Sequence, residues 1–171
     1  VAGLAGAEAA ALVAMVCHLT RNKEDTIAPV LRVAEAARRA FLQLADDDAR
    51  TFAAVMTAWR LPTESRASHL QPALRAAAEV PLGMMTLTAT LVEPLEVLFL
   101  HGNPRLITDV GIAALMLVAA HQSAQMNVLI NLREITDEAF ASMTRSRLRT
   151  LEDVVPRLQQ LGGAIDRNLR Q

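Results

Sequence analysis

A run of about thirty residues without a helix breaker constrains the fold of this chain more than any other feature. Thr26 is suited to cap a helix and Pro29 to lie in its first turn, and the next proline is Pro62. Apolar residues recur in this run at helical spacing, namely Phe41, Leu44, Ala45, Phe52, Val55, Met56 and Trp59. The pattern predicts a long helix that ends near Arg60 and turns this stripe toward the core.

The rest of the chain also has the pattern of helices joined by short connections. The other predicted helices are Ala2 to Thr20, a helix through Leu74 and Ala78 after which Pro81 begins or kinks the next segment, Thr108 to about Leu132, and Thr136 past Pro156 to Gly162 or beyond. Pro94 lies inside the segment that follows Pro81. Gly102 and Pro104 bracket a turn. We therefore predict one all-α domain over residues 1–171, an antiparallel bundle of about six helices with a long second helix.

Composition excludes several classes of protein. The formal net charge is −1 and aromatic residues make up 3% of the chain, which argues against nucleic-acid binding and against attraction to an anionic membrane. Two apolar stretches, Val1 to Leu19 and Val110 to Ala120, are interpreted as packed helices rather than membrane spans or signal peptides. The single cysteine, Cys17, lies in an apolar run, so we expect a buried thiol and a reducing, cytoplasmic location.

Asp48 is the most informative polar position in the long predicted helix. At about 100° per residue, it points within roughly 40° of the centre of the apolar stripe, whereas Asp46 and Asp47 project to either side. A buried carboxylate must be paired or have a raised pKa, and either state can serve proton transfer. The alternative interpretation places Asp48 at the solvated edge of the stripe, within a charged surface formed by all three acids.

Three other polar residues have a structural explanation beside a functional one. Asn127 and Asn131 lie one helical turn apart on the most apolar predicted helix, where buried amides need hydrogen-bond partners and can also recognise a ligand. Asp109 is expected to be a first-turn acid stabilised by the helix dipole. The four histidines do not have the spacing of metal ligands, so we expect no metal site.

Five segments carry a family resemblance: VAGLAGAEAAALVAMVCHLT, DDDARTFAAVMTAWRLP, AAEVPL, GNPRLITDVG and NVLINLREITDEAF. Taken in order, they resemble the cyclodeaminase domain of formiminotransferase-cyclodeaminase and the related stand-alone methenyltetrahydrofolate cyclohydrolases of bacteria. The resemblance implies an all-α homodimer or higher homo-oligomer that acts on a one-carbon unit carried by a tetrahydrofolate derivative. Asp48 falls at the family's proton donor and acceptor. Asp109, Asn127 and Asn131 match polar positions that can orient the substrate, and Lys23 remains from a basic cluster that suits a folate polyglutamate tail.

The chain departs from the family pattern at several positions. A proline-and-glycine-rich segment normally precedes the first helix, and this sequence begins after it. A lysine of the family is Thr63 here, and a serine is Thr108. These departures leave open a non-catalytic helical dimer that binds folate or serves as a scaffold. The residues do not decide between cyclodeaminase and cyclohydrolase activity, and a formimino substrate would have to be made by another chain.

Overall fold

The computed structural model describes residues 1–21 and 23–171, and the regular secondary structure in this part of the chain is entirely helical. Within it lie seven α-helices and one 3₁₀ helix: α1 (Ala2–His18), α2 (Glu24–Trp59), α3 (Thr63–Ala89), α4 (Val92–His101), η1 (Pro104–Leu106), α5 (Ile107–Leu132), α6 (Glu138–Arg149) and α7 (Val154–Leu169). The predicted all-α class is confirmed. The seven α-helices of the described chain exceed the six or so that the sequence predicts, because the predicted last helix is divided into α6 and α7, while the predicted break at Pro81 is replaced by one at residues 90–91.

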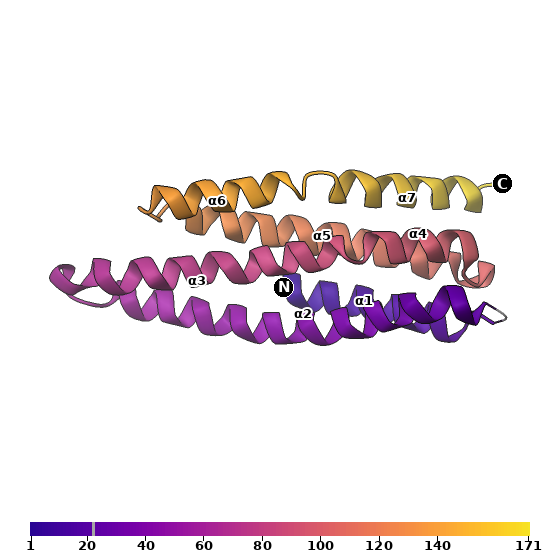
Figure 1. Ribbon diagram of the computed structural model, residues 1–171, viewed down its shortest axis with the longest axis horizontal. Helices are drawn as coiled ribbons and strands as arrows, with labels where there is room; N and C mark the ends of the chain where they lie inside the picture. Colours follow the sequence, from indigo (N-terminus) through magenta and orange to yellow (C-terminus); the bar gives the residue numbers. More distant parts are fainter. Residues whose placement is uncertain (22) are drawn as a thin grey trace.

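Four of the helices form a ring around the main core. The helix α1 packs against α2 and α5, and α3 packs against the same two helices from the other side. The helix α7 lies on α5, whereas α6 is tied to α3 by the ion pairs Arg75 to Asp137 and Arg147 to Glu79, with N–O distances of 2.9 and 2.7 Å. Figure 1 shows the result, an elongated bundle with α6 and α7 along one side.

The two interruptions lie at residues 90–91, between α3 and α4, and at residues 150–153, between α6 and α7. Pro94 and Pro156 are each the third residue of the helix that follows, where the missing N–H would have no partner inside the helix. The continuous last helix predicted from Thr136 to Gly162 is therefore wrong. Pro81 was expected to begin or kink a segment, but α3 continues through it.

The first two helices differ greatly in length, and this difference shapes the molecule. The helix α2 has 36 residues and spans about 54 Å, whereas α1 has 17 residues and spans about 26 Å. The N-terminus consequently lies near the middle of the long axis (Figure 1), where Gly3 packs against Ala45 of α2. Beyond this contact, the described residues of the ring belong to α2, α3 and α5.

The structure corrects the predicted core stripe of α2. Phe41 and Val55 are buried as expected. Phe52, Met56 and Trp59 lie on the same side of the helix, yet 64%, 40% and 42% of their surfaces are exposed. Their predicted burial is therefore wrong for the described chain, in which the three side chains line an open cavity.

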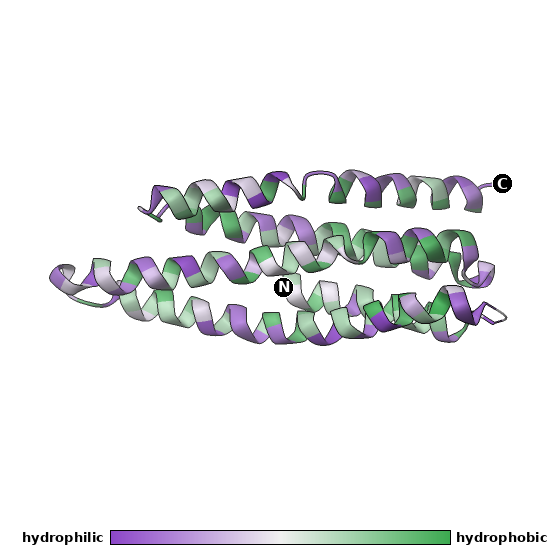
Figure 2. Ribbon diagram, in the orientation of Figure 1, coloured by the Kyte–Doolittle hydropathy of each residue, from purple (hydrophilic) through white to green (hydrophobic). Residues whose placement is uncertain are grey.

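Two stretches, Thr63–His101 and Pro104–Leu132, are long and apolar enough to cross a membrane. Helices inside a bundle pass the same test of length and composition. In the bundle, half of the most apolar window of the first stretch is buried, but only 33% of that of the second. Figure 2 shows pale to green residues along α1 and many purple, hydrophilic residues along α6 and α7.

Candidate functional site

A cavity of about 370 Å³ opens between α2, α3 and α5, beyond the end of α1. Its walls are mainly apolar, and its polar side chains are few, which is the usual composition of a small-molecule site. The helix α2 contributes Asp48, Thr51, Phe52, Val55, Met56 and Trp59; α3 contributes Leu74 and Ala77; Asn127, Ile130, Asn131 and Glu134 come from α5 and the residues just after it.

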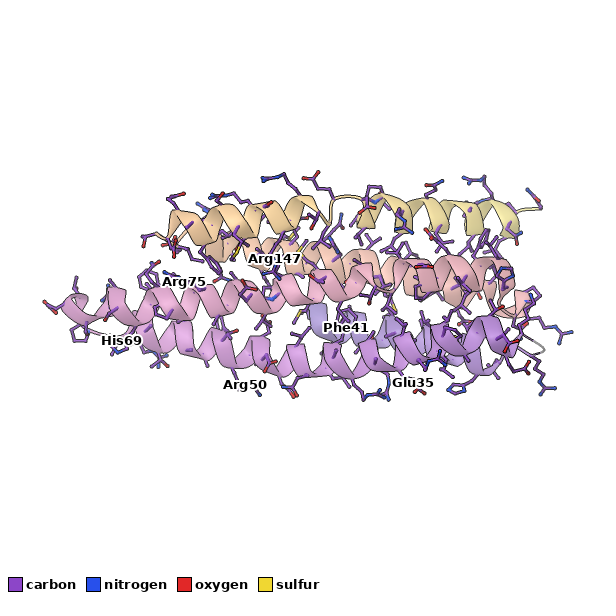
Figure 3. The ribbon with its side chains drawn as sticks, viewed as in Figure 1. Glu35, Phe41, Arg50, His69, Arg75 and Arg147 are labelled. Atoms are coloured by element: carbon purple, nitrogen blue, oxygen red, sulfur yellow. The ribbon has the colours of Figure 1, made fainter. Side chains whose placement is uncertain are left out.

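Asp48 lines this cavity and is half-buried, whereas its two acidic neighbours differ from it. Asp46 is exposed. Asp47 forms an ion pair with Arg50 and accepts a hydrogen bond of 3.2 Å from Gln43 (Figure 3 labels Arg50). Across residues 1–21 and 23–171, the carboxylate of Asp48 has neither an ion pair nor a hydrogen bond. It is therefore available to a molecule in the cavity.

Asn131 connects α5 to α3 across the floor of the cavity. Its Nδ2 donates hydrogen bonds to the carbonyl oxygens of Ala77, at 3.0 Å, and Asn127, at 2.8 Å. Pro81 has no N–H, so the Ala77 carbonyl lacks its usual partner four residues later in the helix. The Asn131 amide supplies that partner, and Asn131 also lines the cavity.

The sequence interpretation missed part of the cavity. Glu134 lies three residues after Asn131 and seven after Asn127, so helical spacing could have placed it on the same face. The apolar wall formed by Phe52, Met56 and Trp59 could not be recognised in the same way, because these residues have the pattern of an ordinary core. Only the arrangement of the helices in the structure shows that these three side chains line a cavity.

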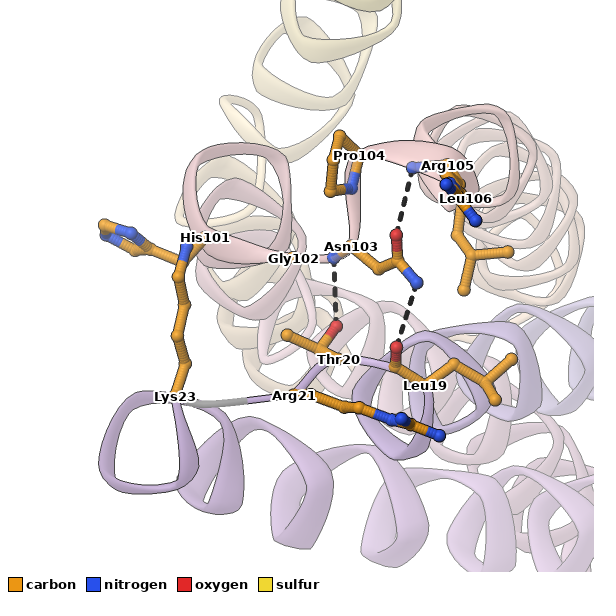
Figure 4. Close-up of a pocket in the computed structure, with 10 residues that line it drawn as sticks. All are labelled: Leu19, Thr20, Arg21, Lys23, His101, Gly102, Asn103, Pro104, Arg105 and Leu106. Carbon is orange, nitrogen blue, oxygen red and sulfur yellow. Dashed lines mark hydrogen bonds between the residues drawn. The ribbon is translucent and has the colours of Figure 1, made fainter.

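Lys23 and Asp109 lie away from the Asp48 cavity. Lys23 lines a second cavity of about 650 Å³, together with Arg21, His101 and Arg105 (Figure 4). Along α2, this position is roughly 37 Å from Asp48. Asp109 is half-buried in the first turn of α5 and is not part of the Asp48 cavity wall. The structure thus brings together Asp48, Asn127 and Asn131, but neither of the other two predicted substrate-binding residues.

The second cavity is framed by the side chain and backbone of Asn103. Its backbone N–H donates to the Thr20 hydroxyl at 3.0 Å, and its Nδ2 donates to the Leu19 carbonyl at 2.9 Å (Figure 4). These bonds join the end of α1 to the turn between α4 and α5. In the described part of the chain, no three His, Cys, Asp or Glu side chains are grouped as metal ligands.

An all-helical bundle with a mainly apolar cavity, into whose lining Asp48 and Glu134 each bring a carboxylate without a partner in the described residues, belongs to the helical proteins that can bind small molecules. Residues 1–150 match the family model described as formiminotransferase-cyclodeaminase. The chain belongs to this family, whose named members below are folate-dependent cyclodeaminases and cyclohydrolases.

Named relatives agree with this assignment. The chain is 36% identical to the methenyltetrahydrofolate cyclohydrolase of Methylorubrum extorquens, over 90% of this chain and 78% of the relative. It is also 36% identical to the formimidoyltransferase-cyclodeaminase of Sus scrofa, over 85% of this chain but only 29% of that longer protein. A crystal structure of formiminotetrahydrofolate cyclodeaminase from Thermotoga maritima superimposes with a TM-score of 0.90 and 31% sequence identity, covering 99% of this chain and 87% of that one.

Proposed function

We propose that this chain is a folate-dependent one-carbon enzyme, a formimidoyltetrahydrofolate cyclodeaminase or a methenyltetrahydrofolate cyclohydrolase, and that Asp48 moves the proton. One observation carries the proposal: the half-buried carboxylate of Asp48 faces a mainly apolar cavity without a partner in the described chain. The cavity volume of about 370 Å³ lies within the usual range for small-molecule sites. The relatives named above support the substrate class.

The apolar wall suits the flat ring system of a folate. Phe52, Met56 and Trp59 on one side and Ile130 on the other can enclose the pterin by burying its faces. Asn127, the Oδ1 of Asn131 and Glu134 offer hydrogen-bonding groups for its polar edge. Binding would remove water from around Asp48, which strengthens its electrostatic interaction with the reacting nitrogen atoms.

In the cyclodeaminase reaction, N10 of the folate attacks the carbon of the protonated formimino group on N5. Asp48 takes the proton that N10 loses and gives a proton to the departing nitrogen, so that ammonia leaves as the 5,10-methenyl bridge closes. In the cyclohydrolase reaction, water attacks the methenyl carbon and Asp48 takes its proton. Asp48 returns this proton to N5 as the bond from that carbon to N5 breaks, and the hydroxyl group loses its remaining proton to solvent, so that 10-formyltetrahydrofolate forms. The Asp48 carboxylate can serve either reaction, so the proposal includes both as alternatives.

Replacing Asp48 by Asn tests the proposal because it keeps the shape and removes the titratable group. We expect the rates of methenyltetrahydrofolate formation and hydrolysis to fall by about 10²- to 10⁴-fold. Asp46→Asn is the matched control, since Asp46 is exposed and outside the cavity, and it should keep the wild-type rates. An unchanged rate in Asp48→Asn would refute the role. Absence of both activities in the wild-type protein, with calorimetric binding of folate retained, would favour a non-catalytic binding protein.

We also propose that the chain works in the cytoplasm as a homodimer or higher homo-oligomer. Cys17 supports a reducing compartment, because it is a buried free thiol and the chain has no second cysteine. Size measurement of the purified protein tests the oligomeric state independently of its activity.

A further inference from the structure

Asp48 is one of two carboxylates in the wall of its cavity; the second is Glu134, which the proton transfer does not use. Glu134 lies in the turn directly after α5, and its side chain is exposed. Within the described residues its carboxylate has no ion pair and no hydrogen bond, although its backbone N–H and carbonyl are both hydrogen-bonded. The Glu134 carboxylate is therefore available to a molecule in the cavity.

The charge of Glu134 does not stabilise the fold. Glu134 follows the last turn of α5, where the negative end of the helix dipole disfavours an acid. The exposed Arg133 precedes it directly, but the two side chains form no ion pair in the described part of the chain. Arg75 of α3, beside this turn, is paired with Asp137. A ligand with N–H donors would give this carboxylate the partner that the protein does not.

The turn after α5 is fixed to α3 before any ligand binds. Nε2 of Gln71 donates a hydrogen bond to the carbonyl oxygen of Glu134 at 2.9 Å, and Oε1 of Gln71 accepts one from the N–H of Thr136 at 2.9 Å. The ion pair between Arg75 and Asp137, also at 2.9 Å, holds the residues that follow. Because α3 already holds this backbone in place, binding through Glu134 loses little conformational entropy.

The two carboxylates lie at different levels along the bundle. Gly83 of α3 packs near Leu44 of α2, and the Asn131 amide of α5 donates to a carbonyl of α3, so both carboxylates can be placed along α3. By this register, Glu134 lies about five residues closer to the turn between α2 and α3 than Asp48 does, which is roughly 8 Å. That separation is comparable with the length of two fused six-membered rings.

We propose, resting on the function proposed above, that Glu134 binds the 2-amino group and the N3–H of the pterin and so fixes the orientation of the folate. A 2-amino-4-oxopteridine has these two N–H donors side by side, at the edge of the ring system remote from the one-carbon unit on N5 and N10. The two oxygens of a carboxylate accept such a pair, as they do from an arginine. With Glu134 on that edge, N5 and N10 lie toward Asp48, where the proton is transferred.

The reversed orientation would bring like charges together. The glutamate tail of a folate carries carboxylates at the end opposite to the pterin, and Glu134 would repel them. Arg66 lies over the ring of Trp59, 5.8 Å from its centroid, but it donates to the carbonyl oxygen of Leu61 at 3.0 and 3.2 Å and does not line the cavity. The tail is therefore expected to leave at the other end of the cavity, toward the beginning of α1.

Calorimetry with 5-formyltetrahydrofolate, a chemically stable folate, tests the role of Glu134. Glu134→Gln keeps the shape and replaces one acceptor oxygen by a donor, so the affinity should fall by about 10- to 100-fold. The analogue with a methyl group in place of the 2-amino group should bind more weakly to the wild-type protein, but with little further loss to the variant. Glu138→Gln is the matched control, because Glu138 is exposed on α6 outside the cavity, and it should bind like the wild type.

Steady-state kinetics separate this binding role from a catalytic or structural one. Glu134→Gln should raise KM by a factor similar to the loss of affinity and leave kcat nearly unchanged, because the contact is the same in the ground state and the transition state. Asp48→Asn should do the reverse, lowering kcat while it retains binding. The urea midpoint of Glu134→Gln should not fall below that of the wild type, since the helix dipole disfavours an acid at this position.

Three results would overturn the inference: unchanged affinity in Glu134→Gln, tighter binding in that variant, or equal discrimination against the methyl analogue by the variant and the wild type. Tighter binding would place the glutamate tail, and not the pterin, beside Glu134. The outcome is separable from that of the proposed function. Folate that binds and is discriminated as expected, but is not turned over, would refute the proposed function alone. Turnover that depends on Asp48, with unchanged affinity in Glu134→Gln, would refute this inference alone.

Discussion

Three consecutive aspartates have three different environments, because neighbouring side chains on a helix are turned by about 100°. Asp46 faces solvent, Asp47 pairs with Arg50, and Asp48 lines the cavity. The helical spacing of the apolar residues was sufficient to separate Asp48 from the other two. Its lack of a partner was not predictable, since that depends on which residues of α3 and α5 lie opposite.

Cys17 leads to a prediction about thiol reactivity. Burial raises the pKa of its thiol to about 11, so the native protein contains very little thiolate at pH 8. We expect labelling by a disulfide reagent to be at least about 100-fold slower in the native protein than in urea. The absorbance of the released thiol reports Cys17 alone, because the chain has no other cysteine. Equal rates in the two states would show that the thiol is not buried.

His121 leads to a prediction about stability and pH. It is buried, its Nδ1 has no hydrogen-bond partner in the described structure, and burial lowers its pKa from the ordinary value of 6.5. The unfolded chain therefore binds a proton before the native protein does as the pH falls below about 6.5. This histidine should reduce the free energy of unfolding by at most about 1.4 kcal/mol per pH unit below that point.

The contribution of His121 to the pH dependence of the free energy of unfolding can be measured by replacing it with a side chain that does not titrate. In His121→Gln, urea unfolding at a series of pH values should show a weaker loss of stability between about pH 6.5 and pH 5. His101→Gln is the control, because His101 is exposed and should leave the slope unchanged. Glu152 also lines the small cavity beside His121. If both variants keep the wild-type slope, His121 is not protonated in that range on unfolding.

At the scale of helices, close packing of α1 on α2 depends on glycine. A Cβ added at Gly6 would overlap the fully buried ring of Phe41, whereas one added at Gly162 of α7 would meet nothing within 4 Å. Gly6→Ala should therefore lower the free energy of unfolding by about 1–3 kcal/mol. Gly162→Ala should raise it by about 0.5–1 kcal/mol, since alanine favours the helix. Urea unfolding followed by circular dichroism measures both, and equal effects would mean that α1 and α2 are not closely packed at Gly6.

The helices themselves were predictable where a single pattern governs a long segment. Periodicity and the positions of Pro29 and Pro62 were enough to identify α2, and Gly102 with Pro104 marked the turn before α5. Prolines were less informative inside α3, where Pro81 is tolerated because Asn131 takes up the carbonyl of Ala77. That compensation comes from another helix, so local sequence does not reveal it. The same holds for the break at residues 150–153, which follows from packing α6 and α7 on different helices.

At the scale of the whole molecule, the cavity lies where the described part of α2 extends past α1 and faces α3 and α5. The helix α1 fills the space between α2 and α5 along only part of their length, and the apolar side of α2 continues past its end. Residues with the pattern of an ordinary core line the cavity instead. Sequence analysis identified the polar residues Asp48, Asn127 and Asn131 but assigned Phe52, Met56 and Trp59 to the core, since it had no measure of which helices lie side by side.

Trp59 makes this arrangement testable, because it is the only tryptophan of the chain and lies in the cavity wall. A folate bound there would exclude water from the half-exposed indole and contact its ring, so we expect saturable quenching of the tryptophan emission as a tetrahydrofolate derivative is added. The Asp48→Asn variant should be quenched in the same way, because it retains the apolar wall. Lys23→Gln is the informative comparison, since Lys23 lines the other cavity. A different result would contradict this arrangement: calorimetry detects folate binding, the emission of Trp59 does not change, and Lys23→Gln abolishes the binding. The folate would then occupy the second cavity, which Lys23 lines, and not the Asp48 cavity.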